Sequence, residues 1–387
     1  MTIWKKAAEV VTGTVTLAGY EVTVGPARHM PPTGGDPHLH LRPDGVIMTH
    51  GVCMDILGWQ SPDGGQTWEH SGWGLGVAAM NRRDGSIVAM DYITFPAEGT
   101  KAGPYNARGR RILPPYANAE APLLAKVDVP GSIPIVDDGG FYGDGVGFWR
   151  DIVEEADGTL LATGYGNFAD NDEPPLGYPK EWGMRRFEVF VMASQDDGRT
   201  WQLRARVAGD RETGQEGFNE STMVDLGNGE LLVVMRTGRA APLYQTRSLD
   251  FGHTWSAPQS LGFSGLDPRL RRLHDGTVLL SSGTRQPDAP WDQANVADYE
   301  TRYVKGQGAD PLMPGSYIRL SRDGGWTYSP PLFIDNGVGQ CYTDVVEYAP
   351  GQLLFAVRHN WRKNTPTDLP QGESRNVAYA ITLKRMA

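Results

Sequence analysis

One short motif, Ser-x-Asp-x-Gly-x-Thr followed by an aromatic residue, occurs four times along this chain. Ser and Asp side chains accept hydrogen bonds from backbone N–H groups, Gly permits a positive φ, and an aromatic ring can pack into a core. We therefore expect each copy to form a tight turn between two strands, with its aromatic residue buried. The copies are SPDGGQTW, SQDDGRTW, SLDFGHTW and SRDGGWTY, at residues 61–68, 194–201, 248–255 and 321–328.

A second repeat lies between these motifs and consists of an apolar strand, a turn centred on glycine, and another apolar strand. Each copy predicts a β-hairpin, and most are followed by a hairpin that carries the first motif. We therefore predict an all-β fold, a six-bladed β-propeller of four-stranded antiparallel blades, with residues 1–387 as a single domain. The turn glycines are Gly45, Gly85, Gly158, Gly229, Gly276 and Gly351.

The two ends of the chain also contain strand-like segments, GTVTLAGYEVTVG at residues 13–25 and NVAYAITLKRM at residues 376–386. Pairing between them would remove two exposed strand edges. We therefore expect the first and last strands to meet in one sheet.

Charge and composition exclude several classes of partner. The formal net charge is −10, and the sequence contains no basic run, so phosphate backbones and anionic lipids repel it. The start of the chain has no convincing secretory signal, and no window of about 18 apolar residues occurs elsewhere. We expect a soluble, cytoplasmic protein that binds neither nucleic acid nor membrane.

Neither a metal nor another cofactor is expected. Cys53 and Cys341 have no CxxC or CxxH neighbours of the kind that bind structural zinc. His38 and His40 have HxH spacing, but no third ligand stands at a recognisable distance from them.

The repeated S-x-D-x-G-x-T-W turns resemble the Asp-box propellers of the sialidase (neuraminidase) superfamily over nearly the whole chain. This resemblance implies a sialidase-like propeller whose inner strands begin at a central pocket, and a carbohydrate substrate. In each repeat the residue nine positions before the turn glycine should then line the pocket mouth. Those residues are Asp36, Gly76, Trp149, Glu220, Asp267 and Tyr342.

Two of the mouth residues match the family's nucleophilic couple. Tyr342 stands in CYTDVVEYAPG, which is similar to the family's Tyr-Ser-Asp segment, where the tyrosine is the nucleophile. Glu220 stands in FNESTMVDLGNG, which is similar to the segment whose glutamate activates that tyrosine. A phenol has a pKa near 10, so it needs a carboxylate partner to react near pH 7. An ion pair between Glu220 and Arg236 is the structural alternative for Glu220.

Arginines supply the expected contacts to substrate. Arg236 and Arg358 both stand seven residues after their turn glycine, and Arg236 matches a family arginine that holds the substrate carboxylate. A guanidinium binds a carboxylate bidentately, so this match implies an acidic sugar. Arg269 lies two positions beyond the mouth residue Asp267 on the same strand face. We assign Arg269, Asp267 and Trp149 to substrate binding.

The first inner strand carries Asp36, Pro37 and His38 where the family has Arg-Ile-Pro. Either Asp36 or His38 is suited to proton transfer, because a carboxylate in a crowded site and a histidine can titrate near neutrality. We therefore predict an exo-acting, retaining glycoside hydrolase that acts on an acidic or short saccharide. Two alternatives stay open: a lyase that acts on uronate-containing glycans, and a non-catalytic propeller that binds glycan or protein.

Overall fold

The computed structural model describes residues 11, 13–33, 36–51, 58–98, 103–135, 145–176, 178, 183–284, 290–335, 342–358 and 376–386. Both cysteines lie outside these ranges. The chain divides into two compact units. The first unit consists of Met1–Gly74, Leu266–Gln286 and Pro311–Ala387, and the second of Leu75–Gly265 and Pro287–Asp310. That the whole chain is one domain stays a prediction.

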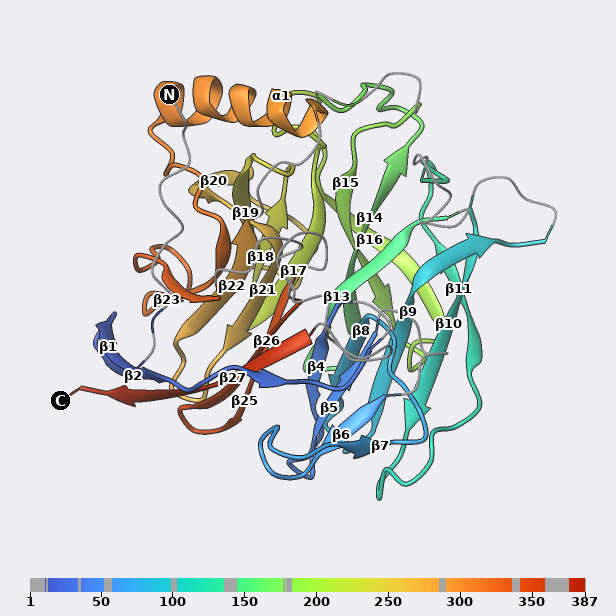
Figure 1. Ribbon diagram of the computed structural model, residues 1–387. Helices are drawn as coiled ribbons and strands as arrows, with labels where there is room; N and C mark the ends of the chain where they lie inside the picture. The colour runs from blue at the N-terminus through green and yellow to red at the C-terminus, as the bar shows by residue number, and fades with distance from the viewer. Residues whose placement is uncertain are drawn as a thin grey trace. The chain divides into compact units, whose positions relative to one another are not determined.

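Three antiparallel sheets make up the described part of the first unit (Figure 1). One has the order β4 (His38–Leu41), β5 (Ile47–His50), β6 (Trp59–Ser61) and β7 (Glu69–His70). Another has the order β21 (Leu266–Arg272), β22 (Val278–Thr284), β23 (Gly315–Ser321) and β24 (Leu332–Asp335). The third has the order β1 (Gly13–Leu17), β2 (Tyr20–Val24), β27 (Asn376–Arg385), β26 (Gln352–Arg358) and β25 (Thr343–Ala349), with β3 (Arg28–His29) also paired to β27.

The predicted pairing of the two chain ends is confirmed. Strand β2 runs antiparallel to β27, in a register that extends from Tyr20 opposite Arg385 to Val24 opposite Ile381. Burial alternates along β2, where Tyr20, Val22 and Val24 are buried and the residues between them are exposed. This alternation with period two is typical of a strand that has one face on a core.

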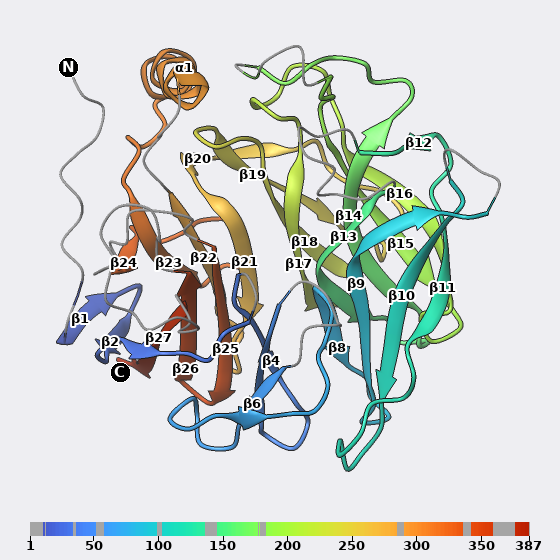
Figure 2. The same ribbon diagram turned by 45° about the vertical axis from the view of Figure 1, so that its right-hand side comes forward.

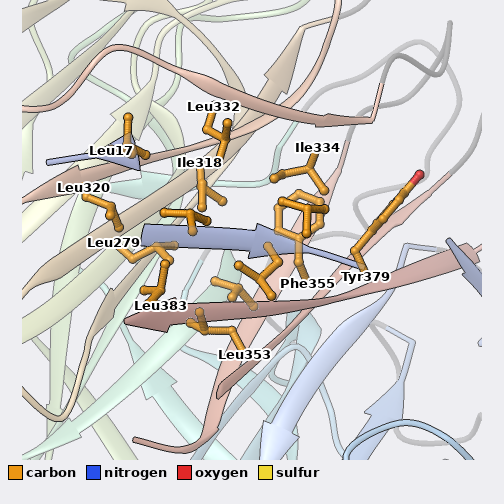
Figure 3. Close-up of a cluster of buried hydrophobic side chains, with 14 of the residues drawn as sticks. Leu17, Leu279, Ile318, Leu320, Leu332, Ile334, Leu353, Phe355, Tyr379 and Leu383 are labelled. Carbon is orange, nitrogen blue, oxygen red and sulfur yellow. The ribbon is translucent and has the colours of Figure 1, made fainter. Parts of the chain in front are cut away.

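That core is a cluster of aliphatic and aromatic side chains from β1, β2, β22, β23, β24, β25, β26 and β27 (Figure 3). Leu279, Phe355 and Leu353 are fully buried within it. Full burial of such a side chain stabilises a fold by about 1.5–3 kcal/mol relative to exposure. The hydrophobic effect therefore holds strands from the start of the chain together with strands from its last third in the first unit.

A nine-stranded sheet and a four-stranded sheet form the described part of the second unit (Figure 2). The large sheet contains β8 (Ala78–Asn81), β9 (Ile87–Pro96), β10 (Tyr105–Ile112), β11 (Leu123–Asp128), β12 (Ser132–Ile133), β13 (Gly147–Glu154), β14 (Leu160–Phe168), β15 (Glu188–Ser194) and β16 (Thr200–Ala208). The small sheet has the order β17 (Asn219–Gly227), β18 (Glu230–Arg236), β19 (Pro242–Ser248) and β20 (Gln259–Ser264).

The helical part of the second unit is short. It consists of α1 (Pro290–Tyr299), a π-helical turn η2 (Glu300–Val304) and α2 (Lys305–Gln307). Among the described residues, no helix has both the length and the apolar character needed to cross a membrane.

The predicted six-bladed propeller of four-stranded blades is wrong, although the all-β class is right. Instead of separate second and third blades, β9, β10, β11, β16, β15, β14 and β13 pair in a closed ring of seven strands. Strand β13 meets β9 at Gly147, where a Cβ atom would stand 2.7 Å from the Tyr92 ring. Elsewhere in the ring, β11 pairs with β16 in parallel. A hairpin pattern in the sequence indicates only antiparallel neighbours, so it does not predict this parallel pair of strands.

The four repeated turns share one hydrogen-bond pattern. In each, the serine hydroxyl donates to the aspartate at 2.7–2.9 Å, and the glycine N–H donates to the serine oxygen at 2.7–2.9 Å. The threonine donates its backbone N–H and its hydroxyl to the two carboxylate oxygens. Trp201 is buried as predicted, and the half-buried Trp68 packs against a cluster of buried side chains. The predicted burial is wrong for Trp255 and Tyr328, which are half-buried.

These hydrogen bonds make the turn aspartates unusually acidic. Although partial burial opposes the shift, the hydrogen bonds from Thr327, Ser321 and Trp326 lower the pKa of Asp323 to about 2, from an ordinary value of 3.8. A carboxyl group with a lowered pKa in the folded state stabilises the fold above its unfolded pKa. That contribution is lost as the pH falls through the folded value.

We expect Asp323→Asn to lower the free energy of unfolding by about 1 kcal/mol at pH 6, because an exposed charged hydrogen bond contributes about this much. The difference from the parent protein should shrink as the pH falls from 4 toward 2. Urea unfolding at several pH values measures it, with the exposed Asp128→Asn as the control. A difference that is independent of pH would contradict this assignment.

Candidate functional site

Three inner strands carry a β-bulge near the register where the sequence predicts pocket residues. The pairing shifts near the start of β13, β17 and β21, at the residues that precede the regular hairpins, and β17 has a second shift near its turn. Each bulge contains a residue other than glycine with a positive φ: Arg150 at 62°, Glu220 at 36° and Asp267 at 45°. Bulges redirect side chains, and backbone strain of this kind clusters at functional sites. The sequence repeat thus marks a structurally distinct position in three strands.

In the first unit, the carboxylate of Asp344 connects three strands. Its Oδ2 accepts a hydrogen bond from Leu39 N of β4 at 2.9 Å, and its Oδ1 accepts one from Arg269 Nε of β21 at 3.0 Å. The Arg271 guanidinium donates to the same Oδ1 at 3.2 Å. The Asp344 side chain is 1% exposed, so these partners compensate a buried charge. Arg269, a predicted substrate ligand, is therefore already ion-paired.

Three predicted site residues meet at the ends of β25 and β26. Arg358 donates from NH1 to Asp36 Oδ1 at 2.8 Å, and its backbone N donates to the Tyr342 carbonyl oxygen at 3.1 Å. The Asp36 and Arg358 side chains are 18% and 25% exposed, and Tyr342 is half-buried. The structure therefore brings Asp36, Arg358 and the Tyr342 backbone together within one unit, and the charged pair is partly exposed.

His38 and Asp267 are more deeply enclosed. His38 opens β4 and lies opposite His50, with the two rings stacked at 5.6 Å and 17° apart in plane. Asp267 is fully buried. Their predicted roles, proton transfer for His38 and substrate binding for Asp267, stay predictions. Within the described residues, no group of three or more His, Cys, Asp and Glu side chains is arranged to hold a metal ion.

In the second unit, one arginine is shared by two glutamates. Arg236 at the end of β18 donates from NH1 to Glu220 at 2.6 Å and from NH2 to Glu216 at 2.9 Å. Asn219 Nδ2 donates to the other Glu216 oxygen at 2.9 Å, and the Tyr178 hydroxyl also donates to Glu216. The ion pair that was the structural alternative for Glu220 is thus present. We call Glu216, Glu220 and Arg236 the carboxylate–arginine group.

Two glycines place Glu216 over Arg236. Gly214 and Gly217 have φ values of 70° and 79°, which favour glycine. A Cβ on Gly217 would stand 2.3 Å from the Phe187 carbonyl oxygen. The Glu216 N–H donates to the Thr237 carbonyl oxygen at 2.9 Å, so this loop packs along the end of β18. The close approach of the backbone is what allows the second glutamate to reach the guanidinium.

Trp149, predicted to contact substrate, lies among other aromatic rings. Its centroid is 5.1 Å from that of Tyr92 and 5.8 Å from that of Tyr165, both in edge-on geometry. The Arg150 guanidinium lies 5.7 Å from its centroid. Packing thus accounts for the position of Trp149, and its contact with substrate stays a prediction.

The predicted couple of Tyr342 and Glu220 also stays a prediction, since Tyr342 belongs to the first unit and Glu220 to the second. Sequence reasoning missed Glu216 and Asp344. Asp344 had a signal, because it stands seven residues before its turn glycine, as does Asp151. Asp151 binds the neighbouring inner strand in the same way, through Met223 N at 2.9 Å. Glu216 lies before its strand and outside the repeat, so the pattern did not mark it.

Comparison with known proteins shows the family. Residues 147–353, more than half of the chain, match the BNR repeat-like domain, and the chain belongs to this family. No curated protein matches the sequence.

Several solved structures have a similar fold. A protein of unknown function from Dyadobacter fermentans has a TM-score of 0.63 at 17% identity, covering 95% of this chain and 100% of its own. The Hadza microbial sialidase Hz136 has a TM-score of 0.55 at 15% identity, with 89% of this chain and 65% of that one covered. The NanB sialidase from Streptococcus pneumoniae, as its K499G mutant, gives 0.54 at 10%, with 90% and 68% covered. At such low identities these likenesses show the fold.

We expect Asp344→Asn to lower the free energy of unfolding by about 3–5 kcal/mol, because it leaves the Arg269 and Arg271 charges without their buried counter-ion. Urea unfolding at pH 7 measures the loss. The exposed Glu21→Gln on β2 removes a charge from the same unit, and this control should change stability by less than about 0.5 kcal/mol. A loss below about 1 kcal/mol for Asp344→Asn would contradict its structural role.

Proposed function

We propose that this chain is a carbohydrate-active enzyme that hydrolyses glycosidic bonds, with its reacting groups at the ends of β4, β25 and β26. Membership of the BNR repeat-like family supports this proposal, and so does the fold shared with two sialidases. The observation that carries it is the Asp36–Arg358 ion pair, whose arginine also donates to the Tyr342 backbone. A carboxylate, a cation and the backbone of the proposed nucleophile from segments distant in the chain support this proposal.

Tyr342 is the proposed nucleophile. Its oxygen attacks the anomeric carbon while the bond from that carbon to the leaving oxygen breaks, which gives a glycosyl-tyrosine intermediate. The leaving oxygen takes up one proton. Water then attacks the same carbon, the tyrosine oxygen departs and takes back the proton that it gave up in the first step, and one proton from the water is removed.

Asp36 and His38 are the proposed groups for these proton transfers. The Arg358 guanidinium, 2.8 Å from Asp36, favours the carboxylate form, which suits a proton acceptor. His38, two residues further along the chain, is the proposed donor. The sequence assigns Glu220 to accept the Tyr342 proton, and that assignment remains part of the proposal.

We expect Tyr342→Phe to reduce kcat on activated aryl glycosides by at least about a hundredfold, because the variant lacks the attacking oxygen. Tyr348→Phe is the matched control, since Tyr348 lies on β25, the strand that Tyr342 precedes, and is half-buried too. Initial rates for both variants across a panel of neutral and acidic aryl glycosides measure the effect. Full turnover in Tyr342→Phe would overturn the proposal.

Product analysis tests the class of reaction. Hydrolysis gives saturated sugars, whereas elimination from a uronate gives an unsaturated sugar that absorbs near-ultraviolet light. Saturated products support the hydrolase, and absorbing products would show the lyase instead. Glycan binding without turnover on any glycoside of the panel would favour the non-catalytic alternative.

A further inference from the structure

We propose that Arg186 and Tyr303 form an oxyanion site in the second unit, which binds a carboxylate, sulfate or phosphate group of a ligand. Both residues belong to this unit. The inference goes beyond the proposed hydrolysis, because it concerns binding alone and requires no reaction at Tyr342.

Arg186 is a buried cation without a carboxylate partner. It lies two residues before β15, and its side chain is among the largest that are fully buried, at 1% exposure. Within the described ranges its guanidinium forms no ion pair, whereas Arg236, Arg269 and Arg358 each have a carboxylate within 3.0 Å. A charge that is taken out of water is unfavourable unless an opposite charge or enough hydrogen bonds meet it.

The hydrogen bonds of the Arg186 guanidinium leave most of its donors unused. All three of its nitrogens carry N–H groups. Of these, NH2 donates to the carbonyl oxygens of Thr213 and Gly214, the second at 3.1 Å. In the part of the chain that the structure describes, Nε is buried without a hydrogen-bond partner and NH1 donates to no residue. An oxyanion supplies both the missing acceptors and the missing negative charge.

The charges around Arg186 do not replace a counter-ion. Burial lowers the pKa of Arg186 below its ordinary value, and the charge of Arg302 lowers it further, while Asp210 and Glu173 oppose the shift from beyond ion-pair distance. Asp210 is exposed, and the Glu173 side chain is 47% exposed with Arg211 beside it, so both carboxylates are screened. Arg186 nevertheless stays protonated at pH 7.

The Tyr303 hydroxyl is the second donor of the oxyanion site. Tyr303 is a buried residue of η2, and it lies close enough to Arg186 that each group affects the pKa of the other. Burial raises the pKa of Tyr303, so the phenol keeps its proton at pH 7. Its oxygen accepts a hydrogen bond from Arg302, whose charge Asp298 meets at 3.0 Å. Among the described residues no acceptor takes the Tyr303 hydrogen, which an oxyanion can accept.

The backbone holds Arg186 in place before a ligand arrives. Its N–H donates to the Glu173 carbonyl oxygen at 2.9 Å, and its own carbonyl oxygen accepts a hydrogen bond from Asn167 Nδ2 at 3.1 Å. Donors that are already fixed cost less to order when a ligand binds.

Calorimetric titration of the whole chain at pH 7 tests the site with sodium sulfate, phosphate, acetate and glucuronate, at an ionic strength held constant with chloride. We expect at least one of these anions to bind with a Kd of about 1 mM or lower. The order of affinities identifies the source of the oxyanion. Glucuronate above acetate indicates an acidic sugar, acetate equal to or above glucuronate indicates a simple carboxylate, and sulfate or phosphate above both indicates one of these groups. The absence of binding by all four anions would overturn the inference.

Variants assign the binding to this site. Arg186→Met removes the charge but keeps a long side chain, and Arg186→Lys keeps the charge on a single nitrogen, so each should weaken binding at least about tenfold. Tyr303→Phe removes only the hydroxyl and should weaken binding about threefold or more. Arg185→Met is the matched control, since it removes the same charge one residue earlier, from a half-buried side chain, and should leave the affinity unchanged. An affinity that is unchanged in every folded variant of Arg186 and Tyr303 would overturn the inference.

Thermal unfolding separates this site from a purely structural role, in which Arg186 only holds the carbonyls of Thr213 and Gly214. A ligand that binds only the folded state raises the Tm, so the anion that binds best should raise the Tm of the parent protein more than that of Arg186→Met. Sulfate and phosphate also stabilise proteins by exclusion from their surface, and both proteins share that effect. An equal rise in Tm for the two proteins would make Arg186 a structural residue and overturn the inference.

Discussion

A charge buried on a strand is tolerated only where an opposite charge or several hydrogen bonds meet it, and one buried ionic group in each unit illustrates this constraint. In the first unit, Asp344 satisfies the constraint by joining Leu39, Arg269 and Arg271. In the second unit, Arg236 satisfies it by joining Glu216 and Glu220. The same contacts that hold the strands together therefore determine which charges a ligand meets.

This dependence changes how the arginines are interpreted. From sequence, an arginine seven residues after a turn glycine, or two residues beyond a mouth residue, indicates a ligand for an acidic group, because its partners are not visible. In the structure, Arg236, Arg269 and Arg358 each have a carboxylate within 3.0 Å. Their positive charges are compensated before substrate arrives. The charge that a substrate meets is therefore the charge of the whole ionic group and not that of the arginine alone.

Local patterns predicted much of the fold. Glycine-centred repeats predicted the hairpins, and the strand-like segments at residues 13–25 and 376–386 predicted the pairing of the two chain ends. The closed ring of strands was not predictable from hairpins, because β11 meets β16 in parallel and Gly147 admits β9 at close range. For the site, counting back from turn glycines marked Asp36 and Tyr342, which Arg358 connects through its side chain and its backbone, and their roles stay predictions. It missed Glu216, whose position depends on a glycine-rich loop and not on a strand.

The central claim is that Tyr342 forms a covalent bond to the sugar, and trapping that intermediate tests it most directly. A fluorinated glycosyl fluoride slows the second step more than the first, so the adduct accumulates. Mass spectrometry of the tryptic peptide 323–358, fragmented to separate Tyr342 from Tyr328 and Tyr348, should locate one glycosyl unit on Tyr342. An adduct on another residue, or turnover of the reagent with no adduct on Tyr342, would contradict the account.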